Sequence, residues 1–397
     1  MVRNRPQGFL SQTKTLSPSG ERVDSPKASG VWGSILAVFR TQHFAASPSL
    51  MPNCPTLAPA LALAIALIFG NPAPVMASPI IIAHRGASAE RPEHTLAAYK
   101  LAIEQGADFI EPDLVPTKDG HLVARHENEI STSTNVASHP EFAARKATKT
   151  IDGQLITGWF TEDFTLAELK TLRARERLPQ LRPANTAWDG QFEIPTLEEI
   201  IALAKAQPRS IGLYPETKHP SYFQSLGLPI EDRLLEILAA SGLVSRQSAV
   251  FIQSFEVNNL KYIAKKSDIR LIQLLAGEGG PADCPGKSYA KMLSPAGLAA
   301  IAAYASGIGA EKSLVIPRTP EGNLGQSTAL VADAHAAGLV VHLWTFRPEN
   351  YFLPNALQSS ADKASKGDAA AEIRAFLKTG IDGLFSDSIP PAIEARK

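Results

Sequence analysis

The chain has 397 residues, of which 44% are hydrophobic and 20% are charged, so it is long enough to bury a sizeable core. Lys plus Arg and Asp plus Glu number 39 each. This neutral balance excludes the strong basic bias of nucleic-acid-binding proteins, and we expect neither nucleic acid nor an anionic membrane surface as a partner.

The N-terminal part has the pattern of an export signal. Residues 1–50 are rich in Ser, Pro, Gly and basic residues, which indicates disorder, and residues 57–69 (LAPALALAIALIF) form a short apolar run. Small residues follow it, and we place cleavage after Ala77. A transmembrane anchor is the alternative, but it needs about 20 apolar residues. Met51 is an alternative start of the chain. We expect a leader with signal peptide over 1–77, a periplasmic or secreted product, and no stable membrane insertion after cleavage.

The cysteines give no disulfide framework. Cys54 lies in the segment predicted to be removed, which leaves Cys284 as a single thiol in a Gly/Pro-rich loop.

Residues 78–397 are predicted to form one domain in which short β-branched runs alternate with amphipathic stretches. Eight strand–helix units of this kind predict an α/β fold, a (β/α)₈ TIM barrel. A doubly wound open sheet is the alternative, but the glycine-rich dinucleotide turn is missing. In chain order we expect strands over 80–83, 109–115, 122–125, 210–216, 250–254, 271–275, 307–310, 340–346 and 383–386. Helices are expected over 95–105, 166–172, 197–206, 231–241, 257–266, 295–304, 327–337 and 370–378.

Three long polar stretches do not fit the alternation. They cover 129–165, 174–193 and 348–368, and we interpret them as loop insertions at the C-terminal face of the barrel.

Ionisable residues gather at the ends of the predicted strands, where the active sites of parallel barrels are built. Glu111 and Asp113 are two positions apart on one strand, so their side chains point to the same side. With Glu216, which ends another strand, they make an all-oxygen carboxylate set that suits Mg²⁺ or Ca²⁺ better than Zn²⁺. A solvated strand end, or ion pairs with Arg85 or Lys218, is the alternative.

His84 and His126 end two further predicted strands on either side of these carboxylates. Two imidazoles flanking a bound diester would supply a general base and a general acid near neutral pH, and Arg85 is suited to bidentate contact with a phosphate. Glu93 is interpreted as a cap of the helix that begins near Thr95, with a water-mediated metal contact as the alternative. The other histidines are expected to be structural or exposed. Phe255, Trp344 and Phe346 are expected to line the mouth or to pack in the barrel.

The stretch IIIAHRGASAERPEHTLAAYKLAIEQGADFIEPDLVPTKDGHLVARHE resembles the N-terminal signature of the glycerophosphodiester phosphodiesterase family. The resemblance continues through YPETK (214–218), QSF (253–255), WTF (344–346) and GLFSD (383–387), so it covers nearly all of residues 78–397. The insertion after His126 and the PEHT variant are similar to the periplasmic, calcium-using branch. One departure is Glu127, where the family usually has Asp after the histidine.

This resemblance implies a TIM barrel that hydrolyses glycerophosphodiesters to sn-glycerol 3-phosphate and an alcohol. It implies His84 and His126 as the catalytic pair, Glu111, Asp113 and Glu216 as metal ligands, and Arg85 and Lys218 as phosphate-contacting cations. The implied cofactor is a divalent metal, Ca²⁺ in preference to Mg²⁺. Two rival functions remain at this stage: a related barrel acting on intact phospholipid, which predicts an apolar rim, and a catalytically silent binding protein, which predicts a lost ligand or histidine.

Overall fold

The computed structural model describes residues 78–397. The predicted leader, the signal peptide and Cys54 lie outside these described residues. Cys284 is half-buried and forms no disulfide within the described part of the chain. Over residues 78–397, no helix is both long enough and apolar enough to cross a membrane.

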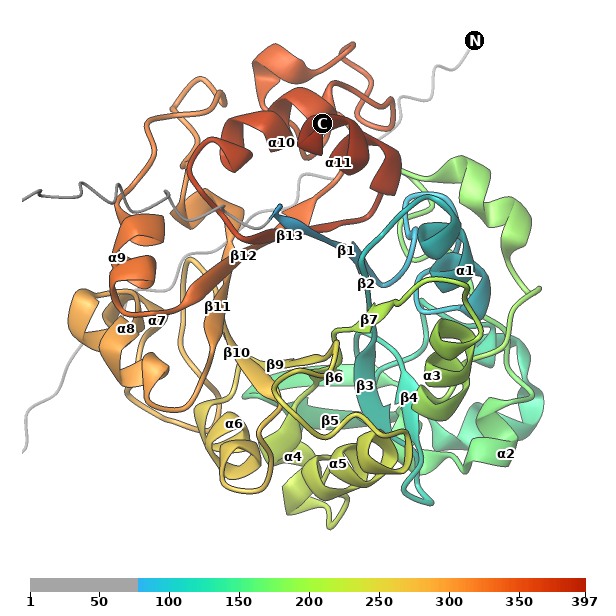
Figure 1. The fold of residues 1–397 in the computed structure, drawn as a ribbon. Coiled ribbons are helices and arrows are strands. Elements are labelled where there is room, and N and C mark those ends of the chain that lie inside the picture. The colour runs from blue at the N-terminus through green and yellow to red at the C-terminus, as the bar shows by residue number, and fades with distance from the viewer. Residues whose placement is uncertain (1–77) are drawn as a thin grey trace, which may run out of the picture. The chain divides into compact units, whose positions relative to one another are not determined.

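A curled sheet of mainly parallel strands forms the centre of the molecule (Figure 1). Strand β1 (Ile80–His84) pairs in parallel with both β13 (Gly383–Ser386) and β2 (Phe109–Glu111). Strand β2 pairs with β7 (Gly212–Leu213), and β3 (Asp113–Pro116) pairs with β8 (Glu216–Thr217). Parallel pairing then continues in chain order from β8 to β13. The other strands of this ring are β9 (Phe251–Ser254), β10 (Arg270–Leu275), β11 (Gly307–Glu311) and β12 (Val340–Phe346). The fold is therefore α/β and TIM-barrel-like.

Prolines interrupt two strands of the ring. Pro112 separates β2 from β3, and Pro215 lies between β7 and β8. Proline has no backbone N–H to donate to the neighbouring strand, so the ladder breaks where it occurs. The two predicted strands over 109–115 and 210–216 are thus each divided into two segments, and both breaks adjoin predicted metal ligands.

Helices surround the ring of strands (Figure 1). Several begin at a capping residue; Thr196, for example, makes a capping box with Glu199 at the start of α3. Their apolar faces join the outer sides of the strands in one large core. The longer helices are α1 (Leu96–Glu104), α3 (Leu197–Lys205), α5 (Glu231–Ala240), α6 (Val257–Ala264), α8 (Pro295–Ala302), α9 (Leu330–Ala336), α10 (Ala369–Leu377) and α11 (Ile389–Arg396).

A second, smaller core lies at the centre of the ring. It consists of Ile82, Tyr214, Phe251, Ile272 and Phe385, which come from strands on all sides. The Tyr214 hydroxyl lies 2.7 Å from Nδ1 of the buried His342, so the polar end of this tyrosine has a partner. The centre of the barrel is filled by side chains, as in closed parallel barrels generally.

The strand predicted over 122–125 is not part of the parallel ring. It is β4 (Leu122–Ala124), which pairs antiparallel with β3 through a short turn. The hairpin signal is the sequence Lys118-Asp119-Gly120, where Gly120 has a φ of 80°. This hairpin returns the chain to the level of Asp113, and it thereby delivers His126 to the site.

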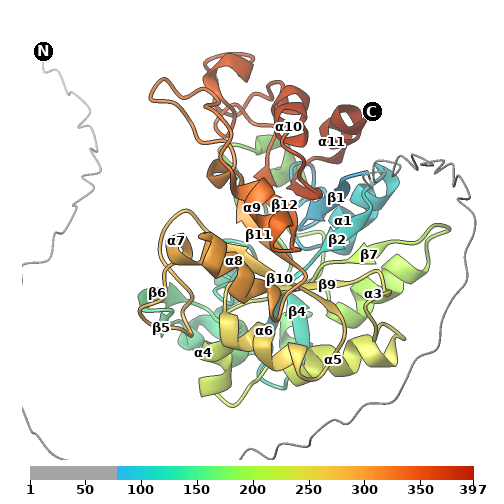
Figure 2. The ribbon, with the colours of Figure 1, turned by 60° about the vertical axis from the view of Figure 1, so that its left-hand side comes forward.

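Several elements were not predicted. The segment 129–165 holds a hairpin of β5 (Ala147–Ile151) and β6 (Gln154–Gly158), and the helix predicted over 166–172 is only α2 (Leu166–Leu169). The short helices α4 (Pro220–Ser225) and α7 (Tyr289–Met292) and the C-terminal α11 were also missed. In Figure 2 the β5–β6 hairpin and α7 lie on the same side of the barrel strands.

Candidate active site

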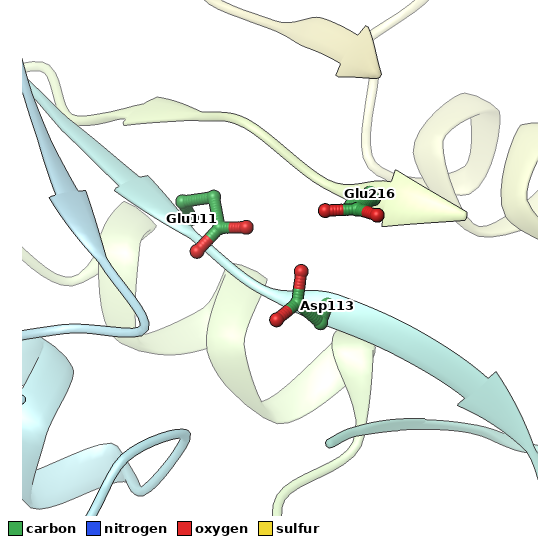
Figure 3. Close-up of side chains that lie close together, drawn as sticks. All are labelled: Glu111, Asp113 and Glu216. Atoms are coloured by element: carbon green, nitrogen blue, oxygen red, sulfur yellow. The ribbon is translucent and has the colours of Figure 1, made fainter. Parts of the chain in front are cut away.

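Three buried carboxylates meet at the proline-interrupted strands. Glu111 ends β2, Asp113 begins β3 and Glu216 begins β8. Each offers one oxygen to a set in which all three atoms lie within 4.8 Å of one another. Figure 3 shows the three side chains, from β2, β3 and β8, turned toward one another. The structure therefore brings together all three predicted metal ligands.

The chemistry of this carboxylate set fits a divalent cation. Oδ1 of Asp113 and Oε1 of Gln253 are buried and have no hydrogen-bond partner among the described residues. Burial and the adjacent Asp113 charge raise the pKa of Glu111 well above its usual value, and burial raises that of Glu216 to about 8. Three carboxylates in so small a space repel one another without a cation between them. Hard oxygen donors of this kind suit Ca²⁺ or Mg²⁺.

Two cations, Arg85 and Lys218, lie next to the carboxylates. The Arg85 backbone N–H donates to Oε2 of Glu111 at 2.8 Å, and its guanidinium lies 3.3 Å from Asp113. Lys218 Nζ lies 3.1 Å from Oε1 of Glu216. Arg85 has a φ of 62°, and the next residue, Gly86, would clash with Ala98 if it carried a Cβ atom. A glycine at this turn lets the Arg85 backbone approach Glu111.

His84 ends β1, and its ring orientation is set by a carboxylate. Its Nδ1 lies 2.6 Å from Oδ1 of Asp387, which follows β13. Because an ionised carboxylate only accepts hydrogen bonds, Nδ1 carries the proton and Nε2 is the basic nitrogen of the neutral ring. Burial, followed by the charge of Arg85, lowers the pKa of His84 to about 4 even though Asp387 opposes the shift.

His126 lies just after β4, with Nδ1 2.9 Å from Oε1 of Glu127. Burial lowers its pKa, and the charges of Arg85 and Lys218 lower it further. Both predicted catalytic histidines are therefore neutral at pH 7 before an anion binds. Each is attached through Nδ1 to a carboxylate, which leaves Nε2 available for chemistry.

These groups border one cavity of about 250 Å³, which suits a small polar molecule. Both histidines, both predicted phosphate-contacting cations and two of the three carboxylates line it; Asp113 lies behind them. The lining residues are His84, Arg85, Glu111, His126, Arg177, Glu216, Lys218, Gln253, Phe255, Leu274, Trp344, Thr345, Arg347 and Phe385. Most of the residues in this wall are polar or charged, and its apolar members are Phe255, Leu274, Trp344 and Phe385.

The interpretation of Glu93 was wrong, and for Phe346 the packing alternative is the correct one. Glu93 does not cap the helix; the Thr95 hydroxyl accepts from the Ala98 N–H instead, and Glu93 binds Arg85 at 3.1 Å and Arg177 at 3.0 Å. Phe346 is fully buried and packs against Phe376, so it is not part of the mouth. Phe255 and Trp344 do border the cavity.

The sequence reasoning missed several residues that hold the site. Arg177, in the stretch 174–193, and Arg347, just before the stretch 348–368, both border the cavity. Asp387 orients His84. His94, expected to be structural or exposed, is buried with Nε2 2.9 Å from Oδ2 of Asp113. Asp387 ends the GLFSD motif, and its position after the last strand was the signal that could have identified it.

Comparison with known proteins identifies the family. The model of the glycerophosphoryl diester phosphodiesterase family matches residues 84–390. The chain belongs to this family. A glycerophosphodiester phosphodiesterase (GDPD6) of Arabidopsis thaliana is 38% identical over 321 residues, covering 78% of this chain and 83% of that protein. The glycerophosphodiester phosphodiesterase of Haemophilus influenzae is 30% identical and covers 77% and 89%.

Solved structures agree on the fold of this glycerophosphodiester phosphodiesterase family member. A phosphodiesterase of Oleispira antarctica, solved in complex with the product sn-glycerol-3-phosphate, aligns with a TM-score of 0.53 at 21% identity, covering 80% of this chain and 96% of that one. The chain is thus an enzyme of the glycerophosphodiester phosphodiesterase class, a phosphoric diester hydrolase, with a buried acidic triad that fits a metal ion.

Proposed function

We propose that the protein hydrolyses glycerophosphodiesters to sn-glycerol 3-phosphate and an alcohol at the cavity between His84 and His126. The observation that carries this proposal is the arrangement of one buried carboxylate triad, two carboxylate-anchored histidines and two cations around a single small cavity. The product found in the related Oleispira antarctica structure supports the glycerol phosphate half of the substrate.

In this proposal Glu111, Asp113 and Glu216 hold a divalent ion, which neutralises phosphate oxygens and orients glycerol hydroxyls when bound. Ca²⁺ is our proposed ion, on the resemblance to the calcium-using branch. Arg85 and Lys218 contact the remaining phosphate oxygens. Their fixed charges face the diester, whose negative charge grows at its oxygens during attack.

The two histidines divide the proton transfers. Neutral His84 takes a proton at Nε2 from the attacking water or glycerol hydroxyl, and Asp387 stabilises the imidazolium that results. His126 donates a proton to the leaving alcohol. The bound diester is an anion, so it raises the low pKa of His126 and allows this histidine to be protonated in the complex.

The finer architecture and location also belong to this proposal. We propose a (β/α)₈ barrel whose stretches 129–165, 174–193 and 348–368 are insertions over the C-terminal ends of the strands. The export pattern before Ser78 supports a periplasmic or secreted enzyme. An N-terminal sequence beginning at Ser78 in protein recovered from the periplasm or medium would test the location.

The activity is tested with the purified full-length protein and glycerophosphocholine, by measuring release of sn-glycerol 3-phosphate. EDTA should abolish the release, and Ca²⁺ should restore it better than Mg²⁺. His84→Ala should lose activity, whereas His121→Ala, at an exposed histidine near Asp119, should not. Activity that survives thorough chelation, or a fully active His84→Ala variant, would refute the mechanism. Faster release of choline or phosphocholine from intact phosphatidylcholine vesicles than of choline from glycerophosphocholine would instead favour an enzyme that acts on intact phospholipid.

A further inference from the structure

The catalytic histidine His126 is connected to the β5–β6 hairpin by a continuous chain of side chains. Glu127 lies 2.9 Å from Nδ1 of His126 through one oxygen and 2.9 Å from Nε2 of His219 through the other. Nδ1 of His219 in turn lies 2.6 Å from Oδ2 of Asp152. Four side chains from three separate segments therefore make one line of close contacts, in which Glu127–His219 and His219–Asp152 are hydrogen bonds and His126–Glu127 is a close N···O contact.

The protonation states along this line follow from its chemistry. Both ring nitrogens of His219 face carboxylates, and carboxylates only accept hydrogen bonds, so both nitrogens must carry protons. Although burial alone would lower it, hydrogen bonds with Asp152 and Glu127 raise the pKa of His219 to about 9. His219 is thus a fixed cation between two anions, and it keeps the Glu127 carboxylate beside Nδ1 of His126.

Left-handed backbone conformations occur at both His219 and Asp152. His219 has a left-handed backbone with φ 45° and ψ 44°, which is uncommon for a residue other than glycine. At the other end, Asp152 and Gly153 have φ values of 49° and 79°, which form the tight turn between β5 and β6. Asp152 is therefore held at the tip of the hairpin, where it reaches His219.

The surroundings favour a role in catalysis over a role in folding. Asp152 and His219 line a second cavity, of about 290 Å³, which shares Glu216 and Lys218 with the catalytic one. The side chains of Glu127 and Asp152 are 39% and 35% exposed, so solvent screens part of their attraction to His219. The positive charge of Lys218 also acts on this line, because it lowers the pKa of both Glu127 and His219.

We propose that Asp152, at the tip of the β5–β6 hairpin, positions His126 through His219 and Glu127. Glu127 has the same place beside Nδ1 of His126 that Asp387 has beside Nδ1 of His84. Asp152, His219 and Glu127 are positioning residues, and His126 remains the catalytic one. The inference rests on the proposed function, because it gives the insertion 129–165 a task in that mechanism.

The first test compares Asp152→Asn and His219→Gln with Glu141→Gln in the full-length, metal-loaded enzyme. Glu141 is a matched control because it lies 2.9 Å from Nδ1 of His139 in the same insertion but outside the cavity. We expect kcat for glycerophosphocholine to fall about three- to tenfold in the two chain variants, with KM within about twofold, and no change in the control. Asp152→Glu should recover part of the loss.

The second test asks whether Asp152 acts through His126. Asp152→Asn is introduced into a His126→Ala background and assayed with a 4-nitrophenyl ester of glycerol 3-phosphate, whose good leaving group needs little proton donation and keeps residual activity measurable. We expect no additional loss in this background, because the residue that Asp152 positions is already gone. An equal loss in both backgrounds would show a general structural role and overturn the proposal.

The outcomes separate this inference from the proposed function. If His126→Ala loses activity while Asp152→Asn equals the Glu141→Gln control, the positioning chain is wrong and the proposed mechanism stands. If His126→Ala is fully active, the acid–base pair itself is wrong, and the chain has no catalytic task. Imidazole ¹⁵N spectra give a readout independent of turnover: Asp152→Asn should shift the His219 and His126 signals, and unchanged His126 signals would contradict the proposal.

Discussion

The Nδ1 atom of His84 lies 2.6 Å from Oδ1 of Asp387, although the two residues are 303 positions apart in the chain. They meet because β1 and β13 are parallel neighbours in the barrel, with Ala83 paired to Ser386. The same carboxylate also binds Arg347 at 3.0 Å and the buried Arg182. Closure of the sheet therefore positions the proposed base.

Replacing Asp387 with Asn should impair chemistry more than binding. An amide cannot stabilise an imidazolium on Nδ1 as a carboxylate does, so we expect kcat to fall about 10- to 100-fold with little change in KM. Steady-state kinetics with glycerophosphocholine measure this. Asp382→Asn is the control, because Asp382 binds His335 at 2.8 Å away from the cavity. Equal kinetics of the two variants would contradict the role of Asp387.

Metal binding should stabilise the folded protein. A cation that binds Glu111, Asp113 and Glu216 only when they are assembled favours the folded state by mass action. We expect Ca²⁺ to raise the Tm of the EDTA-treated protein, and Asp113→Asn to reduce that rise strongly. Asp119→Asn, in the turn between β3 and β4, should keep it. The same calcium-induced shift in Asp113→Asn as in the wild type would place the ion elsewhere.

Arg182 should be important for stability. It is 5% exposed and binds two buried carboxylates, Glu349 at 2.7 Å and Asp387, which join the stretches 174–193 and 348–368 to the barrel. Arg182→Gln removes the arginine that pairs with Glu349 and one of the two arginines that pair with Asp387, and we expect a loss of about 3–5 kcal/mol in the free energy of unfolding.

Chemical denaturation measures this loss, and Arg175→Gln is its matched control. The Arg175–Asp189 pair has a 3.4 Å separation, and the arginine side chain is 50% exposed. Its loss should therefore cost less than about 1 kcal/mol. If Arg182→Gln and Arg175→Gln lowered the free energy of unfolding equally, the buried ion pairs of Arg182 would contribute no more than an exposed pair.

The pH dependence of stability should report on His219. Its pKa is raised in the folded protein to about 9, compared with about 6.5 when unfolded. A raised pKa contributes stability that is fully present below about pH 6.5 and is lost as the pH rises through about 9. Urea denaturation between these values should show this decline in the wild type and a weaker one in His219→Gln. Parallel curves would contradict the imidazolium assignment.

The sequence predicted the parts of the structure that depend on local pattern. The apolar β-branched runs located every strand of the ring, and the E-x-D spacing located two carboxylates that the structure places within one triad. Helix starts were also accessible, because Thr196 with Glu199 is a local capping signal. The α/β class and the inventory of predicted site residues followed from such signals.

Long-range contacts could not be predicted in this way. Asp387, Arg182 and Arg177 were missed because their partners lie far away in the chain, and no periodicity marks an ion pair. The direction of β4 was wrong because an apolar run has the same appearance in a parallel and an antiparallel strand. Glu93 was assigned to its local helix end, whereas two distant arginines compete for it successfully.

The proline breaks at Pro112 and Pro215 have a consequence for engineering. They place the triad carboxylates on the barrel wall itself, at the breaks between strand segments. A designer could therefore keep these wall positions and change a side chain that lines the cavity from another segment, such as Phe255, to recruit a different alcohol.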